Sequence, residues 1–270
     1  MKAKFFIFTI LVLGGCGGKE VIKQGSAAII PQFTKGNISR YSITSITENT
    51  MELQGSSQTQ TSRAIITIEN RIDSIRGEKI FQKFTVSKVE GTVATPMGIQ
   101  TIPNLDQMEG KTIKIVTTKR GKVLKATKEN VEDDFGLNLR NVVESFYDFL
   151  PEGIVNVGDQ WEKKKNENGI KADNMYKLEG FKNKNNKRIA IITGNGTIEI
   201  NKKIDQRGAN IEMSLSGNTK SRIFWFVDSG RISLHSSHYG MEGKGKVSGA
   251  MGNIDVTFYI DQDITIKPIQ

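Results

Sequence analysis

An alternation of apolar and polar residues with a period of two runs along most of the chain and constrains its fold more than any other feature. Clear examples are residues 64–68, 80–86, 112–117, 209–215 and 222–227. Successive side chains of a β-strand point to opposite faces, so this pattern predicts strands with one buried face and one wet face. Because glycines separate runs that are rich in β-branched residues, we expect antiparallel strands joined by tight turns.

Three short segments have the composition of hairpin turns. Residues 119–122, 183–186 and 228–230 each contain glycine or asparagine and stand between two alternating runs, which predicts a tight turn at each of them. The order of strand, glycine-bearing turn and strand occurs in both parts of the chain. It therefore leaves open an internal duplication of two halves, 38–128 and 159–270, although such similarity is also generic for β-meanders.

One stretch in the middle of the chain has a helical period instead. Its apolar residues recur at three- and four-residue spacing: Val131, Phe135, Leu139, Val142, Val143, Phe146, Phe149 and Leu150. Asn130 can cap the first turn, and Pro151 disfavours helical geometry at the residue before it. The pattern predicts an amphipathic helix over about 131–150. We favour a helix that covers the open face of a curved sheet over a lid above a cavity.

These patterns together predict the fold class. We expect a mainly β, antiparallel protein with one or more strongly curved sheets or half-barrels and one central amphipathic helix at about 131–150. The β-rich body spans residues 38–270, and the helix joins its two halves.

The first residues have the character of an export signal. Lys2 and Lys4 precede an apolar run, residues 5–13, that is too short to be a permanent membrane span. The run ends in Leu13-Gly14-Gly15-Cys16, which resembles a bacterial lipobox, the recognition sequence of the lipoprotein signal peptidase. The resemblance implies that residues 1–15 are removed and that Cys16 becomes the lipidated N-terminus. The alternative is an ordinary signal peptide with an incidental cysteine.

Cys16 is the single cysteine of the chain, which excludes an internal disulfide framework and a thiolate metal cluster. Residues 16–37 then form the lipidated cysteine and a flexible tether. Glycine, not aspartate, follows the cysteine, which resembles the pattern of lipoproteins exported to the outer membrane of diderm bacteria. The expected location is the cell envelope, with the membrane as a partner through the acyl chains on Cys16.

The net charge is +9, and removal of residues 1–15 takes away two lysines and no acid, which leaves +7. The excess is concentrated between residues 162 and 207, where polar turns contain Lys163, Lys164, Lys165, Lys182, Lys184, Lys187, Arg188, Lys202 and Lys203. Such a region can bind anionic head groups or polyanionic glycans. Nucleic acid is not an expected partner, because the aromatic residues that stack single-stranded bases are missing. We favour solvated hairpin turns as the explanation.

No residue pattern carries recognisable chemistry. His235 and His238 are three apart, and on a strand such residues point to opposite faces, so we predict no metal site. The glycine-rich run 243–249 lacks the ending of a phosphate loop, and Asp159 is expected to close a turn. We predict no catalytic residue and no cofactor.

The segment Phe149-Leu150-Pro151, followed by Val157-Gly158-Asp159-Gln160-Trp161, resembles a group of uncharacterised bacterial lipoproteins with a lipobox signal and a β-rich body. In that group a Leu-Pro…Val-Gly-Asp-x-Trp segment follows a helix in the middle of the chain. The resemblance does not indicate which activity the protein has. In layout the chain also looks like lipoprotein carriers of the Gram-negative envelope, which hold acyl chains in a concave sheet.

The favoured function is therefore a membrane-anchored envelope lipoprotein with a non-enzymatic binding or structural role, with an envelope protein or a lipid as partner. The first alternative is a carrier that holds an apolar ligand between the sheet and helix 131–150. Its pocket would be on the order of several hundred Å³ and would be lined by Phe135, Leu139, Phe146, Phe149 and Trp161. The second alternative is an envelope hydrolase with an unrecognised site.

Overall fold

The structure, a computed structural model, describes residues 21–22, 24–129, 143–167, 169–206, 209–249 and 252–269. The predicted signal peptide, Cys16 and the first part of the predicted helix, with Phe135 and Leu139, lie outside these residues. The elements of the described part are strands and one short 3-10 turn: β1 (Ser26–Ala28), β2 (Ile38–Leu53), β3 (Ser56–Arg76), β4 (Lys79–Thr95), β5 (Gly98–Thr101), η1 (Leu105–Met108), β6 (Thr112–Thr118), β7 (Val123–Glu129), β8 (Ile154–Asn156), β9 (Gln160–Glu167), β10 (Ile170–Lys184), β11 (Lys187–Gln206), β12 (Ala209–Phe226), β13 (Arg231–Gly249) and β14 (Gly252–Ile269).

One open antiparallel sheet makes up the body. Its 12 strands follow the order β7-β6-β4-β3-β2-β14-β13-β12-β11-β10-β9, with β5 added beside β4. The last strand, β14, pairs with β2, so the C-terminal half of the chain continues the sheet of the N-terminal half. Of the chain between the two edge strands, β7 and β9, the structure describes residues 143–159, which we call the crossing segment. A second, two-stranded sheet pairs β1 with β8. Whether the two halves are a duplication stays a prediction.

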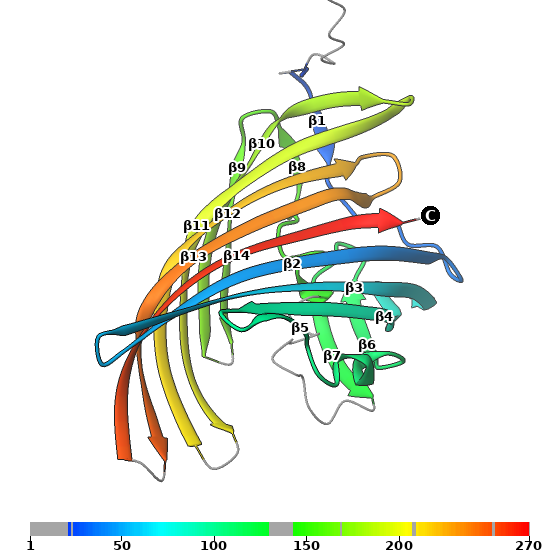
Figure 1. The fold of residues 1–270 in the computed structure, drawn as a ribbon. Helices are drawn as coiled ribbons and strands as arrows, with labels where there is room; N and C mark the ends of the chain where they lie inside the picture. The colour runs from blue at the N-terminus through cyan, green and yellow to red at the C-terminus, as the bar shows by residue number, and fades with distance from the viewer. Residues whose placement is uncertain are drawn as a thin grey trace, which may run out of the picture.

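The long strands curve together, which gives the sheet an inner, concave face and an outer face (Figure 1). Glycines permit this close, bent packing because they lack a Cβ atom. A Cβ atom at Gly217 would overlap the backbone of Gly240 on the next strand. One at Gly243 would overlap the backbone of Ser214. The glycine-rich run 243–249 therefore has a structural role in β13.

The core lies on the inner face, where every second side chain of the strands is buried. Between Lys79 and Val86 of β4 the buried positions are Ile80, Gln82, Phe84 and Val86. The first strand, β1, and the crossing segment pack on this face, and Ile29, Phe149 and Trp225 are each only 1% exposed. This cluster occupies one end of the inner face and holds the N-terminal segment and the crossing segment on the sheet.

The predicted fold class is wrong in its central helix. Residues 143 and 144 alone have helical backbone in the described part of 131–150, and residues 145–149 form turns. The amides of Phe146 and Leu150 donate to carbonyls three residues earlier, those of Val143 and Tyr147. Successive tight turns therefore place aromatic side chains against the sheet at intervals of three residues. In the sequence, this interval is similar to the period of an amphipathic helix. Within the described ranges no helix has the length and apolar character needed to cross a membrane.

Candidate functional site

Phe146 and Phe149, two of the predicted ligand-lining residues, are packed inside the core. The Phe146 ring lies edge-on to Tyr41, with centroids 4.8 Å apart, and 5.9 Å from Phe84. Phe149 lies edge-on to Trp225 at 5.6 Å. The cavity beside Phe146 has a volume of about 30 Å³, which is room for about one water molecule. These two side chains are therefore packed in the core, whereas Phe135 and Leu139, the other predicted lining residues from 131–150, lie outside the described residues.

Trp161, a third predicted lining residue, fastens the crossing segment to the sheet edge. Its indole Nε1 donates to the carbonyl of Phe149 at 2.8 Å, and its ring stacks on Tyr176 at 6.1 Å. Asp159 closes the preceding turn, as the sequence predicted, because its carboxylate accepts from the backbone N–H of Asn156 at 2.7 Å. The Leu-Pro…Val-Gly-Asp-x-Trp segment therefore has a structural role, because it holds the chain against the sheet at the start of β9.

The other end of the inner face holds a second apolar cluster. Its buried members are Leu215, Val256 and Phe258, and half-buried Ile200, Met213, Val247 and Ile260 pack against them. Every one of these residues belongs to β11, β12, β13 or β14. Met51 and Leu53 of β2, opposite Phe258 and Val256, extend the surface and are each 39% exposed. We call these nine residues the distal inner face. Among the described residues, the members of its apolar cluster all belong to the sheet.

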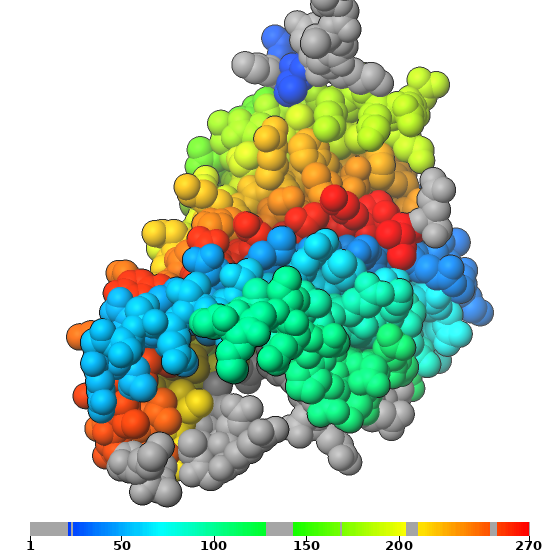
Figure 2. All heavy atoms as spheres, viewed as in Figure 1, coloured from blue at the N-terminus to red at the C-terminus, as the bar shows by residue number. Residues whose placement is uncertain are grey.

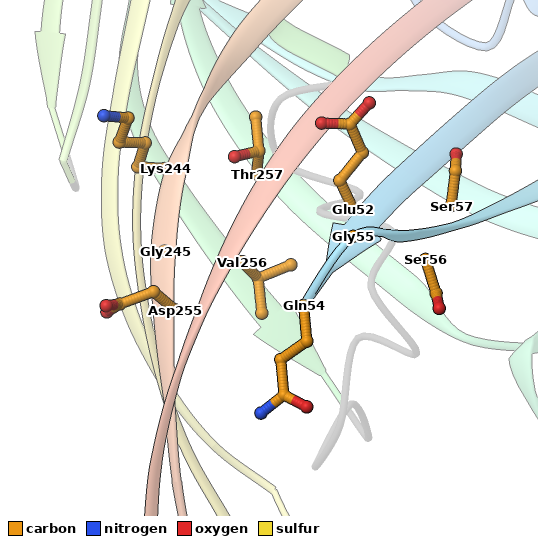
Figure 3. A pocket seen from close by; sticks show the side chains of 10 residues that line it. All are labelled: Glu52, Gln54, Gly55, Ser56, Ser57, Lys244, Gly245, Asp255, Val256 and Thr257. Carbon is orange, nitrogen blue, oxygen red and sulfur yellow. The ribbon is translucent and has the colours of Figure 1, made fainter.

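Two wide grooves on the sheet are polar and open to water. One, of about 650 Å³, lies at the β2–β3 turn and is lined by Glu52, Lys244 and Asp255 among others (Figure 3). A second, of about 640 Å³, crosses from β11 to β2 and is lined by outer-face residues that include Glu48, Glu199 and Asp261. Their charged linings do not suit an acyl chain.

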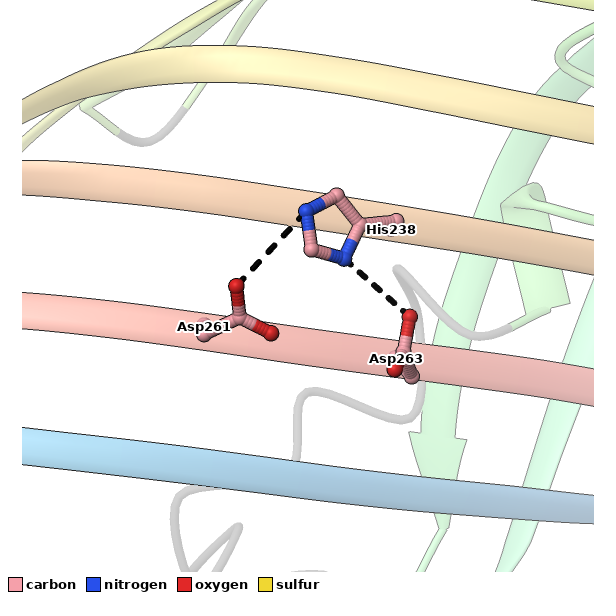
Figure 4. A group of neighbouring side chains, drawn as sticks. All are labelled: His238, Asp261 and Asp263. Carbon is pink, nitrogen blue, oxygen red and sulfur yellow. Dashed lines mark hydrogen bonds and ion pairs between the residues drawn. The ribbon is translucent and has the colours of Figure 1, made fainter.

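The two histidines lie on opposite faces of β13, as their spacing predicted. His238 is on the outer face between two aspartates of β14, with Nδ1 3.2 Å from Asp263 and Nε2 3.6 Å from Asp261 (Figure 4). The atoms that His238, Asp261 and Asp263 could offer to a metal ion lie within 4.8 Å of one another. Sequence reasoning missed this group because only the register of β13 with β14 brings its members together. All three side chains are accessible to water, and His238 already lies within pairing distance of both aspartates.

His235 is a buried histidine on the inner face. It is 7% exposed, its Nε2 lies 2.9 Å from Ser237 Oγ, and its ring lies edge-on to Phe149 with centroids 5.7 Å apart. Burial lowers the pKa of His235 from 6.5 to about 4, because the imidazolium would lose its hydration. His235, His238 and Asp159 have separate partners, so the structure does not bring them together as a catalytic group.

This pKa predicts a loss of stability in acid. The unfolded chain protonates His235 near pH 6.5, whereas the folded chain keeps it neutral to about pH 4. The stabilisation is complete above pH 6.5 and is lost as the pH falls through the folded pKa, with a maximum of about 3 kcal/mol. Burial also raises the pKa of Asp148 to about 7, which gives a slope of opposite sign, so the test compares proteins. In urea unfolding, the wild type and His238→Gln should lose more stability between pH 7, 5.5 and 4 than His235→Gln loses. Equal slopes in all three proteins would contradict the assignment.

The fold and the inner face define a class: open, curved antiparallel sheets that bury apolar side chains on the concave side. Residues 74–230 match the model of a family described as "Family of unknown function (DUF6263)". The match covers more than half of the chain, so the protein belongs to this family. No curated protein matches the chain in sequence.

The fold is shared with a solved structure. That structure is described as "Lipid-protein interactions in lipovitellin" and is similar at 13% sequence identity with a TM-score of 0.57. The likeness covers 88% of this chain and 26% of that chain, so this chain spans about a quarter of the other's length. At this identity the likeness shows the fold alone.

Two outer membrane proteins are similar at a lower level. A COG4313 outer membrane channel from Pseudomonas putida F1 has 9% identity and a TM-score of 0.25, with 89% of this chain and 98% of that chain covered. OprG from Pseudomonas aeruginosa has 7% identity and a TM-score of 0.28, with 92% and 99% covered. TM-scores of this size do not define a shared fold.

Proposed function

We propose that this protein is a membrane-anchored lipoprotein of the cell envelope whose distal inner face binds an apolar ligand, with a lipid acyl chain as the ligand class. The observation that carries the proposal is the second apolar cluster. Its described members all belong to one layer, and an apolar sheet face is stable in water only when another layer covers it.

The composition of the distal inner face suits an acyl chain. Methionine, leucine, isoleucine, valine and phenylalanine from β2 and β11–β14 form a continuous surface, and two methionines, Met51 and Met213, adapt easily to a flexible ligand. Polar side chains of β3, such as Gln58 and Gln60, flank it on one side. Burial of apolar surface contributes about 25 cal/mol per Å², so an alkyl chain laid along these strands gains affinity without a closed pocket. The fold likeness to the lipovitellin structure, whose description concerns lipid–protein interactions, supports the same ligand class.

The anchor belongs to the same proposal. Acylation of Cys16 would hold the body at a membrane, and Gly17 favours the outer membrane of a diderm bacterium. We expect no catalytic activity, because His235, His238 and Asp159 have separate structural partners. Such a protein binds, carries or presents its ligand at the membrane surface.

Native mass spectrometry tests the ligand. The mature chain from residue 16 on, with Cys16→Ser, carries no acyl chains of its own and can be purified without detergent. We expect adducts of lipid mass on this protein. Met213→Asp introduces a charge into the half-buried distal inner face and should abolish the adducts, whereas Ser214→Asp, on the exposed outer face of the same strand, should keep them.

Two results would contradict the proposal. If the protein shows only its polypeptide mass after incubation with phospholipid vesicles, it does not bind lipid. A protein partner would then be the occupant of the distal inner face. Adducts that persist in Met213→Asp would place the lipid elsewhere. Thermal unfolding of both variants checks that loss of adducts does not reflect loss of the fold.

A further inference from the structure

A cluster of cations lies beside two phenylalanines where β10 and β12 end and β11 begins. The Nζ atom of Lys182 lies 3.9 Å from the centroid of the Phe224 ring, and Arg222 Cζ lies 5.4 Å from the same centroid. Lys187 Nζ lies 5.5 Å from the centroid of Phe226. We call Lys182, Lys184, Lys187 and Arg222, with these two rings, the basic patch.

Like charges are brought close together in this patch. Lys184 lies directly opposite Lys187 in the register of β10 and β11. The pKa of Lys182 is lowered by its partial desolvation and by the charges of Lys184 and Arg222. Directly opposed like charges destabilise a sheet, so the fold maintains this arrangement at a cost in stability.

The described carboxylates near these cations have other partners. Within the described ranges, none of the four cations forms an ion pair with a carboxylate. Glu179 on β10 accepts from Thr193 and Lys177, at 2.9 and 3.0 Å. Asp228, in the turn after β12, accepts from the backbone N–H of Arg188 at 3.4 Å. The basic patch is therefore free to pair with anions from outside the chain.

The basic patch lies where the N-terminal segment reaches the sheet. Ile22 exchanges two backbone hydrogen bonds with Phe181, the residue before Lys182, at 2.7 and 2.9 Å. Figures 1 and 2 show this N-terminal end against β10 and β11. Cys16 precedes Val21 by five residues, and five extended residues span at most about 17 Å. A membrane that holds acyl chains on Cys16 is therefore within a short distance of the patch.

We infer that the basic patch docks on anionic lipid head groups of the membrane to which the chain is anchored. This inference rests on the proposed lipidation of Cys16. The short distance favours a lipid surface over a distant glycan or nucleic acid, and a basic surface next to an acyl anchor is an effective second membrane signal. The contact would orient the sheet so that β10 and β11 lie nearest the bilayer.

Binding to vesicles tests the inference. The mature Cys16→Ser chain should co-sediment with vesicles of phosphatidylcholine and 30% phosphatidylglycerol, and not with phosphatidylcholine alone. The binding should weaken as salt is added. Replacement of Lys182, Lys184, Lys187 and Arg222 by glutamine should lower the partition coefficient at least tenfold. The matched control replaces four exposed lysines elsewhere by glutamine, Lys79, Lys125, Lys246 and Lys267, and should bind like the parent.

Two outcomes would contradict docking on lipid head groups, and a control variant tests the fold. Equal loss of binding in both glutamine variants would overturn the inference in favour of net charge. Binding to soluble polyphosphate or heparin without binding to anionic vesicles would also overturn it. Substitution of the three lysines of the patch by arginine should retain binding, which guards against a folding defect. Because the assayed chain carries no acyl group, vesicle binding and fatty-acid labelling of Cys16 can fail independently.

Discussion

The Cys16→Ser substitution should move the full-length protein from the membrane fraction to the soluble fraction and abolish its labelling by fatty acid. Cys16 is the single cysteine, so no other thiol can replace it. Each buried methylene of an acyl chain contributes about 0.8 kcal/mol, and two or three chains on one residue anchor far more firmly than one. The basic patch alone would give reversible binding that a high-salt wash removes. Cell fractionation after such a wash, with an alkyne fatty acid as label, measures both effects.

A matched substitution at the next residue tests the expected location. Gly17→Asp leaves the lipobox cysteine in place, so labelling should persist. If the protein follows the sorting pattern that its sequence resembles, this variant should shift from the outer to the inner membrane fraction. Continued sedimentation and labelling of Cys16→Ser would mean that the assignment of the lipobox is wrong.

Local signals predicted the strands and turns well, because they depend on residues close in sequence. The runs 80–86 and 112–117 lie within β4 and β6. The β10–β11 turn falls within the predicted residues 183–186. It consists of Asn185 and Asn186, which have φ values of 50° and 58°, a conformation that asparagine tolerates. The helix was predicted wrongly because apolar spacing of three residues does not distinguish a helix from successive turns on a sheet.

Features that depend on distant pairing could not be predicted. The pairing of β14 with β2 places Phe258 opposite Met51, and no local pattern indicates that these strands meet. The lysines of the basic patch were visible in the sequence, but Arg222 and the N-terminal segment come to them only through the fold. The same holds for Asp261 and Asp263 beside His238.

Phe149→Ala should be the most destabilising single substitution in the crossing segment. The side chain is 1% exposed and contacts Trp225, His235 and Tyr176, with ring centroids 5.6, 5.7 and 6.4 Å away. Loss of a buried phenylalanine leaves a cavity and costs about 3–5 kcal/mol. Because a domain is stable by only about 5–15 kcal/mol, the urea midpoint of the mature Cys16→Ser chain should fall sharply. Phe81→Ala, a half-buried outer-face site next to Arg76, should cost much less.

This substitution also separates a core residue from a ligand-lining residue. A side chain that lines a ligand site can be truncated with a loss of affinity and little loss of stability, because the bound ligand and not the fold fills the space around it. For Phe149 we expect the reverse: the unfolding midpoint falls, and any protein that remains folded keeps its lipid adducts on the distal inner face. Retained stability together with lost adducts would return the ligand to the space around Phe149 and remove the distal inner face as the site. Met213→Asp, which should lose adducts and keep its fold, provides the opposite pattern for comparison.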